Sequence, residues 1–457
     1  MALYKELTQR HLHSISRVSP QDRIEGWHVY RSLFDSLLEE AAKQDSHGIY
    51  LAPEWTFDIL HEFVYQFQGF CQFRTGVYAN ATKYRPGGQN EGKSPPHHLT
   101  EHLDLLSRNK DAWAVETVMF YLHRIVSIGQ DSFESCPAFS YLGIFASVTL
   151  SRLECLLGDY ASSLSALDSL SSSQTIAPPK NDEEGTPLLA ADIVQSVFAA
   201  QLSMSYHAGV SFLLLRRYRD AAQTLGSICS TLSRGFKAGT FKSIAGHEQF
   251  YKLYERMIAL LGIVTHACPA QGLVEDSIAR IVRDKHGSQL SKIEAGEEGY
   301  EDLFIFACPK FISPSVPPYE LVMEGASGSV TSPMGDAYKL QVQHFMNEMA
   351  SQQTMRKLRS YMKLYTSIEV EKLGRLVLED EVLPLLISYK HKMRQIEKGE
   401  DGADKIGTVM DIHYHIKDDV VHVDEAEKQH RFENYFMSQI SQSNDIIQDV
   451  EAISVKI

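Results

Sequence analysis

Two histidines near the C-terminus are spaced so that they could share a metal ion, and a third follows in the chain. His413 and His415 are two residues apart and therefore lie on the same face of a predicted strand, and His422 follows on the next strand. Neutral imidazole nitrogens are common zinc ligands. A metalloprotease of the kind that removes ubiquitin would place Ser-x-x-Asp after the His-x-His pair, but no serine occurs between His415 and Ser438. The pattern therefore favours a polar, solvent-facing strand edge. The same interpretation applies to a second group at the edge of a polar insert, His97, His98 and His102.

Motifs for nucleophilic catalysis and for phosphate binding do not occur in the sequence. It contains no Gly-x-Ser-x-Gly elbow, no GxxxxGK[ST] loop and no GxGxxG turn after a predicted strand. Pairs of acidic residues, such as Glu183-Glu184, lie in polar linkers, where a solvated surface is more common than acid–base chemistry. We therefore expect no catalytic residue, no bound metal and no cofactor.

A basic cluster is the candidate for a nucleic-acid contact. Lys390, Lys392 and Arg394 lie at the end of a predicted helix, where a groove-reading helix would donate to phosphates. Alternatively, these cations only complement the helix dipole and keep the surface solvated. The net charge of -14 favours the second interpretation, and a weak RNA contact stays open.

The elements around these residues predict a winged helix. A helix over 354–363 leads into a short helix over 369–376 and a second helix from Pro384 to residue 393, since proline favours the first helical position. A hairpin over 411–424 follows a polar linker and turns at Asp418-Asp419. Its apolar positions alternate with polar ones and comprise Ile412, Tyr414, Ile416, Val421 and Val423.

Upstream of the winged helix the chain is predicted to be helical. A strongly apolar helix extends from Pro53 to about residue 74. Two segments, at 157–170 and 215–228, resemble copies of one helix pair in which a tyrosine follows the turn, partly matching the tetratricopeptide pattern. In the second copy Gly209 and Ala221 allow the helices to approach closely. In the first, Ser151 and Glu154 stand where small and aromatic residues would lie, so this copy is degenerate.

These patterns predict a mainly α protein, in which a tetratricopeptide-like solenoid precedes the winged helix and a C-terminal amphipathic helix. The expected domains are an N-terminal helical segment (1–99, with a flexible insert at 76–98), helical repeats (100–351, with linkers at 171–187 and 324–335), the winged helix (352–424) and a C-terminal helix and tail (425–457).

Composition indicates a cytoplasmic protein. The first 13 residues are too polar for a signal peptide, and no apolar run reaches the roughly 18 residues of a membrane span. The six cysteines are widely separated and form no CxxC pair. This spacing favours reduced, buried thiols over disulfides or a zinc site.

Several motifs resemble one protein family. A helical stack followed by a winged helix is similar to the PCI module of the proteasome lid, the COP9 signalosome and eukaryotic translation initiation factor 3, and would cover about 210–424. Residues 300–304 (YEDLF) and 308–319 (CPKFISPSVPPY) resemble the subunit L family of that initiation factor. Further motifs of this kind are 62–68 (EFVYQFQ), 156–160 (LLGDY), 216–218 (RRY) and 363–366 (KLYT).

The resemblance implies a non-catalytic scaffold subunit that supports 43S preinitiation-complex assembly and mRNA recruitment to the small ribosomal subunit, with subunit K as an adjacent partner. PCI winged helices are expected to pair edge to edge. The terminal helix would either join partner helices or fold back on its own winged helix. The predicted partner interface comprises Ile412, Tyr414, Ile416, Val421, Val423, Phe432, Phe436 and Ile440. The alternatives are a PCI scaffold of the proteasome lid or signalosome, and a winged-helix RNA-binding protein acting alone.

Overall fold

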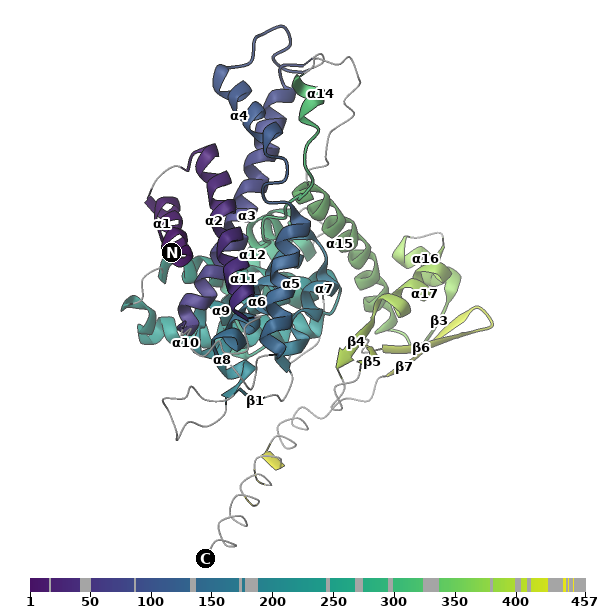
Figure 1. Cartoon of the computed structure of the whole chain (residues 1–457). Helices are drawn as coiled ribbons and strands as arrows, with labels where there is room; N and C mark the ends of the chain where they lie inside the picture. The colour runs from purple at the N-terminus through teal and green to yellow at the C-terminus, as the bar shows by residue number, and fades with distance from the viewer. Residues whose placement is uncertain are drawn as a thin grey trace, which may run out of the picture. The chain divides into compact units, whose positions relative to one another are not determined.

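The computed structural model divides the chain into two compact units and confirms the prediction of a mainly α protein (Figure 1). The first, the helical unit, comprises residues 1–264 and 281–347; the second, the winged-helix unit, comprises 265–280 and 348–457. The structure describes residues 1–15, 18–41, 51–85, 88–131, 137–171, 175–176, 188–243, 247–267, 274–294, 299–323, 337–378, 381–398, 404–408, 412–425, 439–440, 443 and 447.

Among the residues that the structure describes, the helical unit consists of helices and one small two-stranded sheet. Three helices contribute residues to both units: α11 (His247–Ala267), α12 (Asp276–Glu294) and α15 (Ala337–Met362). The other helices of this unit are α1 (Ala2–Ile15), α2 (Pro20–Ala41), α3 (Pro53–Thr82), α4 (His97–Arg108), α5 (Val115–Asp131), α6 (Pro137–Leu157), α7 (Tyr160–Ser165), α8 (Ala190–Ser196), α9 (Phe198–Leu214), α10 (Tyr218–Ala238), α13 (Tyr300–Ala307) and α14 (Tyr319–Met323). The short elements are η1 (Asp168–Ser171), β1 (Thr175–Ile176), β2 (Leu188–Leu189) and η2 (Thr240–Ser243).

Aromatic side chains from α2, α3 and the turn between α4 and α5 pack together in the core of the helical unit. The rings of Phe34 and Phe63 meet edge to face with centroids 4.8 Å apart, and Trp113 packs 5.4 Å from Phe63. All three are essentially inaccessible to solvent. Burying an aromatic side chain contributes about 1.5–3 kcal/mol, so this cluster is a main source of stability for the unit. Helix α6 packs on α3 and α9; its stretch Ala138–Leu157 is long and apolar enough to cross a membrane, but 94% of it is buried here, as in the core of a globular protein.

Both predicted helix pairs are present. In α9–α10, Tyr218 is 1% exposed at the start of α10, and a Cβ atom on Gly209 would lie 2.5 Å from Cδ2 of Leu225. The glycine therefore allows the close approach that the sequence predicted. In α6–α7 the contact is polar: the Ser163 hydroxyl donates to the carbonyl of Ser151 at 2.8 Å, and the Ser211 hydroxyl of α9 donates to Ser163 at 3.0 Å.

Residues 308–319, hereafter the strap, cross the surfaces of α3 and α6; residues 308–318 have no helix or strand structure, and Tyr319 begins α14. The side chain of Gln68 donates to the carbonyl of Lys310 at 3.1 Å, and Arg74 donates to the carbonyl of Pro314. The backbone N–H of Ile312 donates to the carbonyl of Leu156 at 3.0 Å. The strap thus binds together helices that are distant in sequence, which gives this motif a structural role inside the unit.

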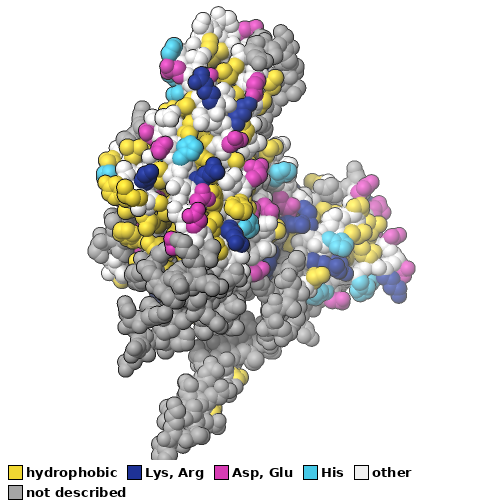
Figure 2. All heavy atoms as spheres, in the orientation of Figure 1, with side chains coloured by type: hydrophobic (Ala, Val, Ile, Leu, Met, Phe, Trp, Pro, Cys, Tyr) yellow, Lys and Arg dark blue, Asp and Glu magenta, His cyan; other side chains and the backbone are white. Residues whose placement is uncertain are grey.

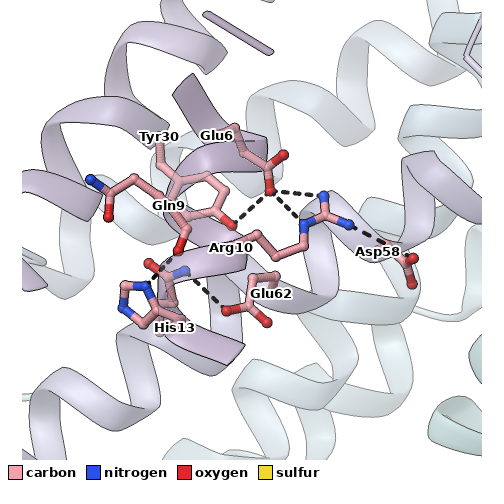
Figure 3. A network of polar contacts seen from close by, with 8 residues as sticks. Glu6, Gln9, Arg10, His13, Tyr30, Asp58 and Glu62 are labelled. Atoms are coloured by element: carbon pink, nitrogen blue, oxygen red, sulfur yellow. Dashed lines mark hydrogen bonds and ion pairs between the residues drawn. The ribbon is translucent and has the colours of Figure 1, made fainter. Parts of the chain in front are cut away.

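Helix α1 docks on α2 and α3 through a polar network (Figure 3). Glu6 is the fully buried residue of α1, and its carboxylate accepts from the Arg10 guanidinium at 2.8 Å and from the Tyr30 hydroxyl at 3.2 Å. Arg10 also lies 3.7 Å from the Asp58 carboxylate of α3. An unpaired buried carboxylate would destabilise the fold. The hydrogen bonds from Arg10 and Tyr30 therefore allow the Glu6 carboxylate to be buried.

The winged-helix unit follows the predicted order of elements. After the end of α15 it contains β3 (Ser367–Glu369), α16 (Val370–Val377), α17 (Val382–Lys392), β4 (Arg394–Lys398), β5 (Asp404–Thr408), β6 (Ile412–Lys417) and β7 (Val420–Glu425). Strands β3, β7 and β6 form one antiparallel sheet in that order, and β4 pairs with β5.

Several predicted boundaries were wrong. The insert at 76–98 is shorter, because α3 continues to Thr82 and buries Val77, Tyr78 and Ala81, and α4 already begins at His97. The polar linker between α17 and the hairpin contains the β4–β5 ribbon. Helix α17 begins at Val382, two residues before Pro384. The helix tolerates this proline because the N–H groups of the first turn have no partner within the helix, so the missing N–H costs no hydrogen bond.

Candidate interaction surfaces of the winged-helix unit

The hairpin β6–β7 forms as predicted, and its turn sets the pattern of its edges. Asp418 and Asp419 have φ values of 51° and 58°, as a two-residue type I′ turn requires. Lys417 and Val420 flank this turn, and such a flanking pair is hydrogen-bonded. Pairs then alternate along the hairpin, so Tyr414 and Ile416 are in non-hydrogen-bonded positions. Their backbone N–H groups are therefore directed away from β7, to the outer edge of β6, which has no paired strand among the described residues.

Three of the predicted interface residues lie in the unit's own core. Ile412, Tyr414 and Val421 are 4%, 6% and 0% exposed and pack with residues of α15, α16 and α17. The Tyr414 hydroxyl donates to the carbonyl of Leu386 at 2.5 Å, and burial raises the pKa of this phenol to about 12. These side chains are occupied within the unit, because the apolar face of the hairpin is covered by the unit's own helices.

The other predicted interface residues differ in their positions. Ile416 is 39% exposed, and Val423 is partly buried against the core. Ile440 is exposed, whereas Phe432 and Phe436 lie outside the described residues. Among the residues described, the apolar surface that the hairpin offers is therefore limited to Ile416, beside the unpaired backbone of the β6 edge.

The three cations predicted to contact RNA have different surroundings. The Lys392 ammonium lies 3.1 Å from the Glu348 carboxylate and donates to the Ser351 hydroxyl at 2.7 Å. The Lys390 ammonium lies 5.8 Å from the centre of the Tyr414 ring, and Arg394 is exposed at the start of β4. Figure 2 shows cationic and histidine side chains interspersed with hydrophobic and acidic ones on this unit. Lys392 is thus paired within the unit, whereas Lys390 and Arg394 are exposed, and a contact of these cations with RNA stays a prediction.

Two of the three predicted histidines, His415 and His422, meet across the hairpin, and His413 is paired with Asp424 in the strand register. The rings of His415 and His422 stack with centroids 5.1 Å apart, and Nδ1 of His415 lies 3.6 Å from the Asp424 carboxylate. His415 and Asp424 are mostly exposed. Within the described part of the chain, no three His, Cys, Asp or Glu side chains are arranged to hold a metal ion.

Three exposed aliphatic residues, at the C-terminus of α16 and on α17, were not predicted from the sequence. Leu378 is 86% exposed, Leu383 is 41% exposed and Ile387 is 57% exposed. The side of α17 that faces the core carries Val382, Leu386 and Tyr389 instead. The signal for the second face was the four-residue spacing of Leu383 and Ile387, which was hidden when the helix was expected to begin at Pro384.

Comparisons with known proteins identify the family. A family model described as RNA polymerase I-associated factor PAF67 matches residues 22–443. Proteins named eukaryotic translation initiation factor 3 subunit L are similar along nearly the whole chain. The protein of Nematostella vectensis is 26% identical over 99% of this chain and 82% of its own length. Those of Aedes aegypti and Drosophila melanogaster are 28% and 27% identical over 98% and 100% of this chain and over 81% and 82% of their own lengths.

This similarity confirms the resemblance to the subunit L family that the strap and the other motifs indicated. The family model covers most of the chain and includes the strap, both helix pairs and the winged helix. The chain therefore belongs to the Paf67 family.

Proposed function

We propose that this protein is a non-catalytic scaffold subunit of the eukaryotic translation initiation factor 3 complex. In this role it supports assembly of the 43S preinitiation complex and recruitment of mRNA to the small ribosomal subunit. The observation that carries the proposal is the similarity to proteins named subunit L of that factor over 98–100% of the chain. A cytoplasmic location, with no membrane contact, belongs to the same proposal.

The role of a scaffold agrees with how the polar residues of the structure are used. The Ser151, Ser163 and Ser211 hydroxyls join helices, Glu6 is paired with Arg10, and Lys392 is paired with Glu348. These groups hold the fold together, and stable surfaces for partners are what such a fold provides.

The edge of β6 supports pairing with a neighbouring winged helix. An unpaired strand edge presents N–H and C=O groups that can hydrogen-bond to a strand of another chain. Here the outward N–H groups belong to Tyr414 and Ile416, and the Ile416 side chain adds apolar contact. We expect the neighbour to be another PCI subunit, with subunit K adjacent. The C-terminal residues Phe432, Phe436 and Ile440 remain a second proposed contact with partner helices.

Affinity purification tests the proposed complex. The tagged full-length chain should recover other initiation factor 3 subunits in stoichiometric amounts from cytosol, and should sediment with small ribosomal subunits. Recovery with a proteasome lid or signalosome instead would contradict the proposal. If Lys390→Ala, Lys392→Ala and Arg394→Ala together abolish binding of the isolated protein to RNA, with a strong dependence on salt, the alternative of a solitary RNA-binding protein gains support.

A matched pair of variants tests the β6 edge. Ile416→Pro removes an outward N–H group but no hydrogen bond to β7, so the unit should fold while partner retention falls. Ile416→Ala keeps the N–H group and shortens the side chain, so retention should fall much less. Equal losses for both variants would mean that the side chain, and not strand pairing, makes the contact.

A further inference from the structure

The exposed face of α17 is aliphatic where a winged helix that reads nucleic acid would carry hydrogen-bond donors. Leu383 and Ile387 are four residues apart and therefore lie on one side of the helix. More than two fifths of each side chain is exposed. Donors such as Arg, Lys and Asn contact base edges and phosphates, and Leu and Ile cannot. This face, hereafter the α17 face, is suited to an apolar partner.

Leu378, at the end of α16, is a further exposed aliphatic residue and has an unfavourable backbone conformation. It caps the C-terminus of α16 with a φ of 65°, a left-handed conformation in which glycine is usual. Its side chain is 86% exposed. A leucine in this conformation is disfavoured by about 1 kcal/mol. Because its side chain is exposed, no burial of apolar surface within the isolated unit offsets this cost. The exposure of this side chain is explained if a partner covers it.

The charges around the α17 face are ordered along the helix. Glu381 is exposed at the N-terminus of α17, whereas Lys390, His391 and Arg394 are exposed at its C-terminal end. The helix itself, Val382–Lys392, contains no acidic residue. A complementary partner must place acidic groups beside the C-terminal end of α17 and basic groups beside its N-terminus.

An antiparallel helix satisfies this charge order. Acidic residues are favoured in the first turn of a helix and basic residues in the last turn, because they interact with the helix dipole. When such a helix lies antiparallel to α17, its acidic N-terminus faces Lys390, His391 and Arg394, and its basic C-terminus faces Glu381. The two helix dipoles are then also favourably opposed.

We infer that the α17 face binds an amphipathic helix of another polypeptide, antiparallel to α17, with aliphatic residues at four-residue spacing against Leu383 and Ile387. This inference goes beyond the proposed function and does not depend on it, because the occupant is defined by its chemistry. The proposed pairing of the β6 edge with a neighbouring strand would be a separate contact, because backbone groups make it and not a helix face.

Site-specific photo-crosslinking in the full-length chain tests the inference. The variant Ile387→p-benzoylphenylalanine is expressed in cells, irradiated and purified, and the crosslinked peptide is identified by mass spectrometry. Ile406→p-benzoylphenylalanine is the matched control, because Ile406 is an aliphatic residue of the same unit that is 78% exposed on β5. We expect a crosslink from position 387 to a segment of another protein with the predicted apolar and charge pattern.

Three results would overturn the inference: a yield at position 387 no higher than at 406, crosslinks only to RNA, or crosslinks only to this chain's own C-terminal segment. A second measurement does not rely on the probe. Without crosslinking, the Ile387→Asp variant should retain roughly tenfold less, or even less, of the partner protein identified by crosslinking than the unchanged chain does, and the Ile406→Asp variant should retain as much. If initiation factor 3 subunits are not recovered but the predicted helix is crosslinked from another protein, the proposed function fails and this inference stands.

Discussion

The helix pairs α6–α7 and α9–α10 share a similar turn but bring their helices together by different means. In α9–α10 the contact is apolar: Gly209 leaves room for Leu225, and Tyr218 is fully buried. In α6–α7 the contact is made by hydroxyl groups, with Ser163 between Ser151 and Ser211.

The difference shows that a degenerate repeat can keep its geometry after losing its apolar signature. A serine is nearly as small as alanine, so Ser151 and Ser163 allow close approach, and their hydrogen bonds replace part of the lost apolar contact. Hydrogen bonds contribute less than buried aromatic area. The apolar pair should therefore be the more sensitive of the two to substitution.

Truncation of the two tyrosines tests this comparison with the largest effect. Tyr218→Ala should lower the free energy of unfolding by about 4 kcal/mol, because it leaves a cavity at a fully buried position. Tyr160→Ala should cost only about 2 kcal/mol, because Tyr160 is half-buried and loses mainly its hydrogen bond to Gln341. Denaturant titration of both variants measures the difference, and equal losses would contradict it.

The glycine of the apolar pair provides the next effect. Gly209→Val should destabilise the protein by about 2.5 kcal/mol, because the new side chain meets Leu225 in a packed interior. Gly76→Ala is the control, since no atom lies within 4 Å of the added Cβ. It should stabilise α3 slightly, by up to about 1 kcal/mol. Thermal unfolding of the two variants should thus show shifts of opposite sign.

Removal of a hydroxyl tests the polar pair. Ser163→Ala should cost about 1.5 kcal/mol, because the Ser151 carbonyl and the Ser211 hydroxyl both lose a buried hydrogen bond. Ser165→Ala, at an exposed position of the same helix, should change the unfolding free energy by less than about 0.5 kcal/mol. A Ser163 variant as stable as the Ser165 variant would show that the hydroxyls do not hold this pair together.

The smallest expected effect depends on pH. Burial and the nearby Asp159 carboxylate raise the pKa of Glu154 to about 7 from an ordinary value of 4.5. Between these values the native state binds more protons than the unfolded state, so the free energy of unfolding falls as pH rises through that window. After allowance for solvent screening, Glu154→Gln should add about 1 kcal/mol at about pH 8 and nothing at about pH 4. Unfolding of this variant and of the exposed control Glu301→Gln across that range measures the effect.

The sequence predicted local features better than their surroundings. The turn at Asp418-Asp419 and the burial of Tyr218 follow from patterns within a few residues, and both are present. Periodicity placed Ile412 and Tyr414 on one apolar face, but it does not state what covers that face. Here α15, α16 and α17 cover it, so the part of the proposed partner contact that lies on the hairpin is reduced to the β6 edge and Ile416.

The remaining misses concern boundaries. The polar composition after residue 76 hid the last turns of α3, since Val77, Tyr78 and Ala81 are spaced among polar residues. Pro384 hid the start of α17, and with it the aliphatic α17 face. In each case polar composition or a proline predicted a helix boundary correctly in kind but at the wrong residue, because buried apolar residues extend the helix past that point.

The strap also determines when the helical unit can be completed during synthesis. Gln68 and its acceptor Lys310 are 242 residues apart, and Arg74 and Pro314 are 240 residues apart. A nascent chain therefore exposes the surfaces of α3 and α6 that the strap covers to solvent long before residues 308–319 leave the ribosome. Incomplete chains with uncovered apolar surface are prone to aggregate. Molecular chaperones that bind this protein co-translationally should thus be released only after the strap has been translated.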